Sequence, residues 1–164
     1  MHGRLAAQRL LAALVALASG CGPRERAADH AVPSVPSVPS VEYVAMPGRM
    51  GLPFSAVVRV GPMLYLSGQL GTDSTGRLAP GGIAPETAQA LANIRRLLEA
   101  QGSGMNRVVK CTAMLADMAE WGAMNQEYLR HFPAGLPARS AFGTSGLALG
   151  ARVELECLAV AGAG

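Results

Sequence analysis

An arginine and two glutamates near the C-terminal end of this 164-residue chain are the residues best suited to do chemistry. Arg139 lies in LPARSAF, and Glu154 follows fifteen positions later in RVELECLAV, with Glu156 two residues further on. A guanidinium presents a planar fork of donors that matches a carboxylate. A half-buried glutamate has its pKa raised by lost solvation and lowered by a nearby cation, so it can be tuned as a base. We expect Arg139 to be that cation, although an ion pair at an interface would use the same residues.

The strand that carries the glutamates is predicted from Ala151 to Val160. Successive side chains of a strand point to opposite faces, so Glu154 and Glu156 share one face. We expect helices to cover the other face, which carries Val153, Leu155, Cys157 and Ala159. The glutamates should therefore point toward a partner subunit.

Other elements must position this strand. The apolar runs FSAVVRV and MLYLSGQL, separated by Gly61-Pro62, predict a hairpin, and a helix is expected from near Pro85 with Leu91, Ile94 and Leu98 on its apolar side. The strand RVVKCTAML follows, and then a helix from Met118 to about His131 that Asp117 and Glu120 begin as a capping box. A strand from Ala138 to Gly143 precedes the last one. We expect the stripe of the second helix to be core: Trp121, Met124, Tyr128 and Leu129.

The predicted fold class is α+β, with a mixed sheet, two helices packed on one face and the order β-β-β-α-β-α-β-β. The strands are too apolar to leave the second face in water, which predicts self-association.

The N-terminal segment is typical of an export signal. Basic residues precede an apolar stretch from Leu10 to Ala18 that is too short to span a bilayer, and small residues follow it. LASGC resembles the lipobox of bacterial lipoproteins, with Cys21 as the lipidated residue. The expected organisation is a signal peptide over residues 1–20, a lipidated tether rich in Pro, Ser and Val over 21–40, and a domain over 41–164. An ordinary signal with a nearby free cysteine, or a short membrane anchor, is the alternative. We expect the domain to be exported and to face the periplasm or the cell exterior.

Charge and composition narrow the function. The formal net charge of +3 becomes +1 once residues 1–20 and their two arginines are removed, and the chain has a single lysine, so we expect no nucleic-acid partner. The histidines have no metal-ligand spacing, and no cofactor is expected. Cys111 and Cys157 lie in apolar runs, where a disulfide and two buried thiols are equally plausible.

Four motifs in order, LYLSGQLG, NQEYLRHFP, LPARSAF and VELECLAV, resemble the RidA/YjgF family over Val41 to Ala161. The resemblance implies a chorismate mutase-like homotrimer with clefts between subunits. It also implies hydrolysis of enamine and imine acids, such as 2-aminoacrylate and 2-iminopropionate or 2-iminobutyrate, to 2-oxo acids and ammonia.

In that family the arginine at the position of Arg139 holds the substrate carboxylate, and the glutamate at the position of Glu154 positions water. Ser67, Gly68 and Asn125 match residues that line the cleft. The chain departs from the family at Ala141, where many members have cysteine, and at Phe54, where tyrosine is common. A module that binds small carboxylates in the same cleft without turnover is the alternative function.

Overall fold

The computed structural model describes residues 38–46 and 51–162. These residues belong to one compact unit, Ser37–Gly164. The predicted signal peptide, the lipidation site at Cys21 and the tether up to residue 37 lie outside the described residues. Within the described part, no helix is long and apolar enough to cross a membrane.

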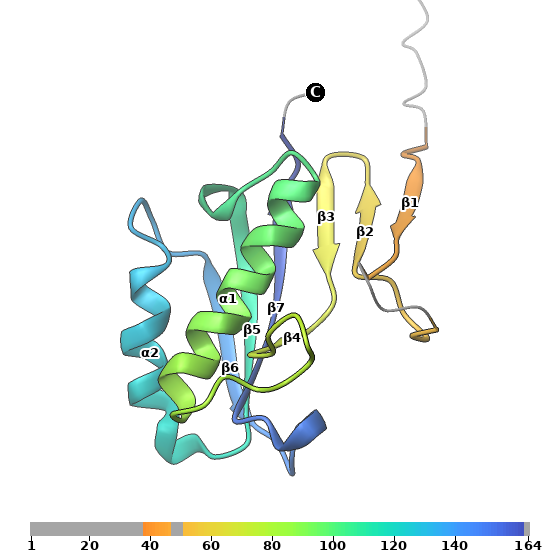
Figure 1. The fold of residues 1–164 in the computed structure, drawn as a ribbon. Helices are drawn as coiled ribbons and strands as arrows, with labels where there is room; N and C mark the ends of the chain where they lie inside the picture. Colours follow the sequence, from red (N-terminus) through yellow and green to blue (C-terminus); the bar gives the residue numbers. More distant parts are fainter. Residues whose placement is uncertain (1–37, 47–50, 163–164) are drawn as a thin grey trace, which may run out of the picture. The chain divides into compact units, whose positions relative to one another are not determined.

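The described residues form a seven-stranded sheet and two α-helices (Figure 1). In chain order the elements are β1 (Val41–Val44), β2 (Val57–Val60), β3 (Met63–Leu66), β4 (Gln69–Leu70), α1 (Ile83–Ala100), the 3-10 turn η1 (Met105–Arg107), β5 (Val108–Leu115), the 3-10 turn η2 (Met118–Glu120), α2 (Trp121–Arg130), β6 (Ala138–Gly143), the 3-10 turn η3 (Ala148–Gly150) and β7 (Val153–Val160). The strand order is β1-β2-β3-β7-β5-β6, with β4 paired to β7. The pair β5 and β6 is parallel and the others are antiparallel, so the predicted α+β fold with a mixed sheet is confirmed.

The run MLYLSGQL was expected as one strand, but the structure divides it into β3 and β4. The side-chain amide of Gln69 donates to the carbonyl oxygens of Ser67 and Gly68, each at 3.0 Å, and holds the bend between them. β3 pairs with the C-terminal half of β7, whereas β4 pairs Leu70 with Glu154 near its start. The division therefore brings the Ser67-Gly68 link next to Glu154.

Both helices lie on the same face of the sheet (Figure 1). Leu91, Ile94 and Leu98 of α1 are fully buried in the core. On β7 the side chains alternate as expected: Val153, Leu155, Cys157 and Ala159 are buried, while Glu154, Glu156, Leu158 and Val160 are not. The predicted assignment of the two faces of β7 is confirmed.

Two polar residues of α1, Glu86 and Asn93, are buried. The Asn93 amide donates to the carbonyl oxygens of Leu70 at 3.0 Å and Thr72 at 2.9 Å. The Glu86 carboxylate accepts the backbone N–H of Arg152 at 2.8 Å. Apolar periodicity cannot reveal such residues, because each one satisfies backbone groups that come from elsewhere in the chain. They fix β4 and the approach to β7 against α1.

The predicted stripe of α2 is only half right. Met124 and Tyr128 are buried, but Trp121 and Leu129 are 44% and 52% exposed. The helix packs mainly against α1, so it buries a narrower stripe than a helix lying across a sheet. Its start also differs: Asp117 accepts the N–H of Ala119 at 2.9 Å, but Glu120 pairs with Arg152, and Met118–Glu120 forms a 3-10 turn before the α-helix.

None of the helices in the described part of the chain covers the second face of the sheet. The strand registers place on it the following side chains, most of them apolar: Val41, Tyr43, Val58, Val60, Met63, Tyr65, Lys110, Thr112, Met114, Phe142, Glu154, Glu156, Leu158 and Val160. We call this surface the open face. An apolar surface of this kind is typical of a protein–protein contact.

Candidate active site

Glu154 lies on the open face, between β4 and β5. It pairs with Leu70 on one side and with Met114 on the other. The side chain is half-buried, and burial raises the pKa of its carboxyl above the ordinary value, with a further increase from the charge of Glu156. A carboxylate with a raised pKa on a half-buried surface is suited to accept a proton from water.

The Ser67-Gly68 link lies directly against the Glu154 carboxyl. A Cβ built on Gly68 would lie 2.8 Å from Cδ of Glu154 and closer still to its Oε1 atom, so only glycine leaves this carboxyl in place. The Ser67 hydroxyl donates to the carbonyl oxygen of Ser55 at 2.7 Å and thereby anchors the preceding loop. Phe54, the residue before Ser55 in that loop, is 50% exposed. We call Glu154, Gly68, Ser67 and Phe54 the glutamate half-site.

Arg139 lies on the edge strand β6, beneath α2. Its Nη2 donates to Oδ1 of Asn125 at 2.6 Å, and its Cζ lies 4.7 Å from the ring centroid of Tyr128. Burial raises the pKa of Tyr128 to about 12, although the Arg139 charge opposes the shift, so the phenol is neutral under Arg139. The Asn125 oxygen and the aromatic face thus hold one side of the guanidinium. We call Arg139, Asn125 and Tyr128 the arginine half-site.

The two half-sites lie on opposite faces of the sheet. Glu154, Met114 and Phe142 are register partners across β7, β5 and β6, and their side chains share the open face. Arg139 is three positions from Phe142 and therefore points the other way, toward α2. Within one chain Arg139 therefore does not lie beside the glutamates, and it is not among the groups that shift the pKa of Glu154. Their meeting in a cleft between subunits stays a prediction.

Sequence reasoning did not assign Tyr128 to the site, because its place in the apolar stripe of α2 predicted core alone. The side chain is indeed buried, but its ring is also the surface on which Arg139 lies. A signal was available: Tyr128 follows Asn125 by three residues, a spacing that puts both on one side of a helix. Ala141, the other departure from the family pattern, is partly buried against the core.

A cavity among the described residues lies elsewhere. It has a volume of about 560 Å³, and its lining includes Arg95, His131 and Leu136 but neither half-site. Among residues 38–46 and 51–162, no group of three or more His, Cys, Asp or Glu side chains is placed to hold a metal ion.

Comparison with known proteins shows which family has the motifs that supply the two half-sites. A family model described as Endoribonuclease L-PSP matches residues 49–161. The chain belongs to the RidA/YjgF family. The chain is 46% identical over 111 residues to the mouse protein named 2-iminobutanoate/2-iminopropanoate deaminase, a match that covers 67% of this chain and 82% of the relative. The human protein of the same name is 41% identical over 117 residues, covering 71% and 85%.

Solved structures confirm the RidA/YjgF fold. The yeast protein YEO7 has a TM-score of 0.70 at 31% identity and covers 75% of this chain and 100% of its own. The YjgF gene product of E. coli has a TM-score of 0.66 at 27% identity, covering 73% and 98%. The described domain is therefore a RidA/YjgF fold with one sheet and two helices.

Proposed function

We propose that this RidA/YjgF protein hydrolyses small imine and enamine acids, among them 2-iminopropionate, 2-iminobutyrate and 2-aminoacrylate, to 2-oxo acids and ammonia. The observation that carries the proposal is the pair of half-sites: an anchored guanidinium and a half-buried carboxylate of raised pKa, in a chain whose relatives are named as deaminases of such imines. This reaction needs the substrate held, one water oriented and one proton accepted.

The active site forms between two subunits in this proposal. A substrate with three or four carbons spans only a few ångströms, so the groups that act on its carboxylate and its imine carbon must be close together. Within one chain Arg139 and Glu154 point to opposite faces of the sheet. The two half-sites come together when a second copy covers the open face of the first and places the β6 edge of the second copy beside Glu154 of the first. Closed cyclic symmetry repeats this contact, and a homotrimer is the assembly we propose.

Arg139 binds the substrate carboxylate. Asn125 accepts from one Nη2 hydrogen and Tyr128 supports the flat face of the guanidinium, which fixes its plane before the substrate arrives. The remaining N–H groups form a fork that donates two parallel hydrogen bonds to a carboxylate. This orientation places the imine carbon toward the glutamate half-site of the adjacent subunit.

Glu154 orients and deprotonates the attacking water. The water oxygen bonds to the imine carbon while its proton passes to the Glu154 carboxylate. The carboxyl returns this proton to the nitrogen, which gives a carbinolamine. The hydroxyl proton of the carbinolamine then passes through Glu154 to the nitrogen, so the carbon–nitrogen bond breaks, the 2-oxo group forms and ammonia leaves. Gly68 keeps the space that the carboxylate occupies, and Ser67 ties this link to Ser55, which follows Phe54 in the chain.

The site of action in this proposal is outside the cytoplasm. The basic and apolar N-terminal segment and the small residues before Cys21 support export, with a lipid on Cys21 as anchor and the Pro-Ser-Val segment as tether. RNA is not a proposed substrate, because the chain without residues 1–20 is nearly neutral and carries one lysine.

A direct assay tests the activity. The full-length protein, purified in mild detergent, is given 2-iminopropionate that an amino-acid oxidase generates in place, and loss of the imine is followed through its reaction with semicarbazide. We expect faster loss of imine than in buffer, with a decrease of at least roughly 100-fold in kcat/KM for Arg139→Ala and for Glu154→Gln. Arg130→Ala removes an exposed arginine of α2 and is the matched control, with unchanged activity.

The outcomes separate the two candidate functions. Wild-type protein that assembles but does not accelerate imine loss contradicts the deaminase proposal. If such a protein still binds 2-oxobutyrate in calorimetry, and Arg139→Ala abolishes that binding, the site is a carboxylate-binding module. Retained binding with lost turnover in Glu154→Gln supports the deaminase.

A further inference from the structure

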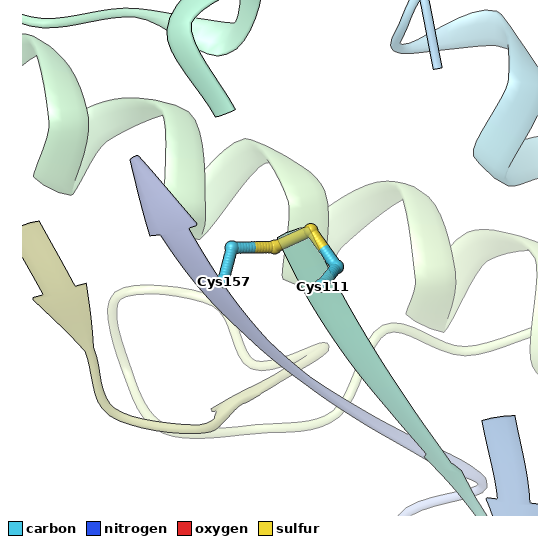
Figure 2. Close-up of a disulfide and its surroundings, with 2 residues drawn as sticks. All are labelled: Cys111 and Cys157. Atoms are coloured by element: carbon cyan, nitrogen blue, oxygen red, sulfur yellow. A yellow bond between two sulfur atoms is a disulfide. The ribbon is translucent and has the colours of Figure 1, made fainter. Parts of the chain in front are cut away.

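Two of the chain's three cysteines occupy facing positions on neighbouring strands. The antiparallel register of β5 and β7 pairs Cys111 with Cys157, which are 46 positions apart in sequence and have Cα atoms 4.1 Å apart. Figure 2 shows the two side chains joined through their sulfur atoms, one from each strand. Directly opposed positions of an antiparallel pair are close enough for this bond, whereas Cα atoms more than ~7 Å apart are not.

The placement of both cysteines is specific. Each side chain is 1% exposed, and both belong to the core between the sheet and α1. A shift of either cysteine by one residue would move it to the open face, because side chains alternate along a strand. Two cysteines that match in register, in face and in burial have the geometry of a cross-link.

We propose that Cys111 and Cys157 are joined by a disulfide in the mature protein, that the bond is a permanent part of the fold, and that it forms after export from the reducing cytosol. This inference does not rest on the imine chemistry. It also rests on an observation different from the N-terminal segment that predicts export, since it concerns two core positions of the domain. Disulfides persist in oxidising compartments and are rare in the cytosol.

Formation of the bond requires an oxidant, which is the disulfide of an exported thiol–disulfide oxidoreductase. One cysteine thiolate attacks a sulfur of that disulfide and forms a mixed disulfide, and the second thiolate then displaces the enzyme's sulfur. Cys111 and Cys157 together lose two protons and two electrons, and the oxidoreductase leaves as a dithiol. The exchange must precede final packing, because both sulfurs are enclosed in the folded domain.

Burial distinguishes a structural bond from a redox switch. A redox-sensing cysteine must be accessible to its oxidant and its reductant, and neither Cys111 nor Cys157 is accessible. The bond also joins strands next to both half-sites. Arg139 of β6 is the register partner of Cys111, and Cys157 is three residues from Glu154 on β7. The cross-link therefore fixes the strand that neighbours Arg139 to the strand that carries Glu154.

The test uses the full-length chain purified from cells that export it. The protein is unfolded in iodoacetamide without reductant and its peptides are mapped. We expect a linked peptide pair containing Cys111 and Cys157, with both cysteines alkylated only after reduction. Alkylation of both without reductant would overturn the proposal.

Stability measurements test the structural role. Reduction, verified by mass, should lower the unfolding midpoint by roughly 10 °C. The variant Cys111→Ala/Cys157→Ala should have a midpoint that does not respond to reductant, which makes it the control. Reduction of the native protein without loss of stability, with activity that changes reversibly, would show a switch and contradict a permanent cross-link.

A chain without residues 2–20 should remain in the cytosol with both thiols free, and oxidation there would refute the dependence on export.

Discussion

At the residue scale, the arginine half-site shows how a buried aromatic ring can prepare a cation for a ligand. The guanidinium of Arg139 lies on the ring of Tyr128, and its hydrogen bond to Asn125 fixes the rotation of its plane. The Tyr128 hydroxyl is buried, and no group of residues 38–46 and 51–162 hydrogen-bonds to it. The ring rather than the hydroxyl is therefore what the site uses.

Two substitutions of Tyr128 distinguish the contribution of its ring from that of its hydroxyl. Tyr128→Phe keeps the aromatic face and removes an unpartnered hydroxyl, so KM and kcat should stay near their wild-type values. Tyr128→Leu removes the face, and KM should rise roughly tenfold while kcat changes less, because the carboxylate grip becomes loose. Steady-state kinetics on the imine substrate measure both. Equal losses in the two variants would contradict this role of the ring.

The pKa of Glu154 gives a second test at this scale. Activity needs the carboxylate, so kcat/KM should fall as the pH drops through a pKa that burial and Glu156 raise above the ordinary value of 4.5. Glu156→Gln removes one raising cause and should move this acid limb to lower pH. Glu99→Gln, on the exposed side of α1, should leave the limb in place. A limb that does not move in Glu156→Gln would show that Glu154 does not set it.

The raised pKa of Glu154 makes activity rise with pH, but it makes the stability of the folded protein fall with pH. A raised pKa means that the folded chain binds the proton of Glu154 more tightly than the unfolded chain. The contribution of Glu154 to stability is thus present below the ordinary pKa of the carboxyl and is lost as the pH rises through the raised value. At the pH where Glu154 is ionised and can act as a base, this contribution to stability is therefore absent.

At the element scale, the bend between β3 and β4 positions the glutamate half-site. Gln69 ties the two carbonyl groups of the bend, and Asn93 and Glu86 fix β4 and the start of β7 to α1. Gly68 lies at the point where this bend meets Glu154, and no side chain fits there without displacing the carboxylate.

Gly68→Ala tests this contact. The added methyl group should displace the Glu154 carboxylate and lower kcat by roughly 100-fold, while the unfolding midpoint changes little because the carboxylate end of a glutamate can move. Gly122→Ala is the matched control, since a Cβ on Gly122 in α2 meets nothing within 4 Å. Kinetics and thermal unfolding of both variants are compared. Unchanged kcat in Gly68→Ala would mean that the observed position of Glu154 is not the catalytic one.

Local patterns in the sequence were sufficient for most elements but not for the contacts between them. The Gly61-Pro62 turn, the buried side of α1 and the alternation along β7 follow from residue periodicity, and the structure confirms them. The bend at Ser67-Gly68 and the burial of Glu86 and Asn93 depend on partners distant in sequence. The family motifs likewise pointed to Arg139 and Glu154 as candidate site residues. That these two residues lie on opposite faces of the sheet became visible only from the strand registers.

At the scale of the whole molecule, the open face and the divided site have one explanation. The open face is lined by apolar residues such as Tyr65 and Leu158, and Glu154 lies at one end of β7 within it. The proposed assembly would cover this face, remove apolar surface from water and complete each proposed active site in the same step. Activity should therefore depend on assembly.

The most direct test of a site shared between subunits is complementation. In the proposed assembly, full-length Arg139→Ala and Glu154→Gln chains should each be nearly inactive. Mixed oligomers should contain contacts where an intact Arg139 of one chain meets an intact Glu154 of another. Unfolding and refolding the two variants together at equal concentrations should restore about a quarter of wild-type activity, since half of the chains carry each intact residue. Activity that stays at the level of the separate variants, in mixed oligomers verified by mass, would show that both residues act within one chain and would contradict the shared site.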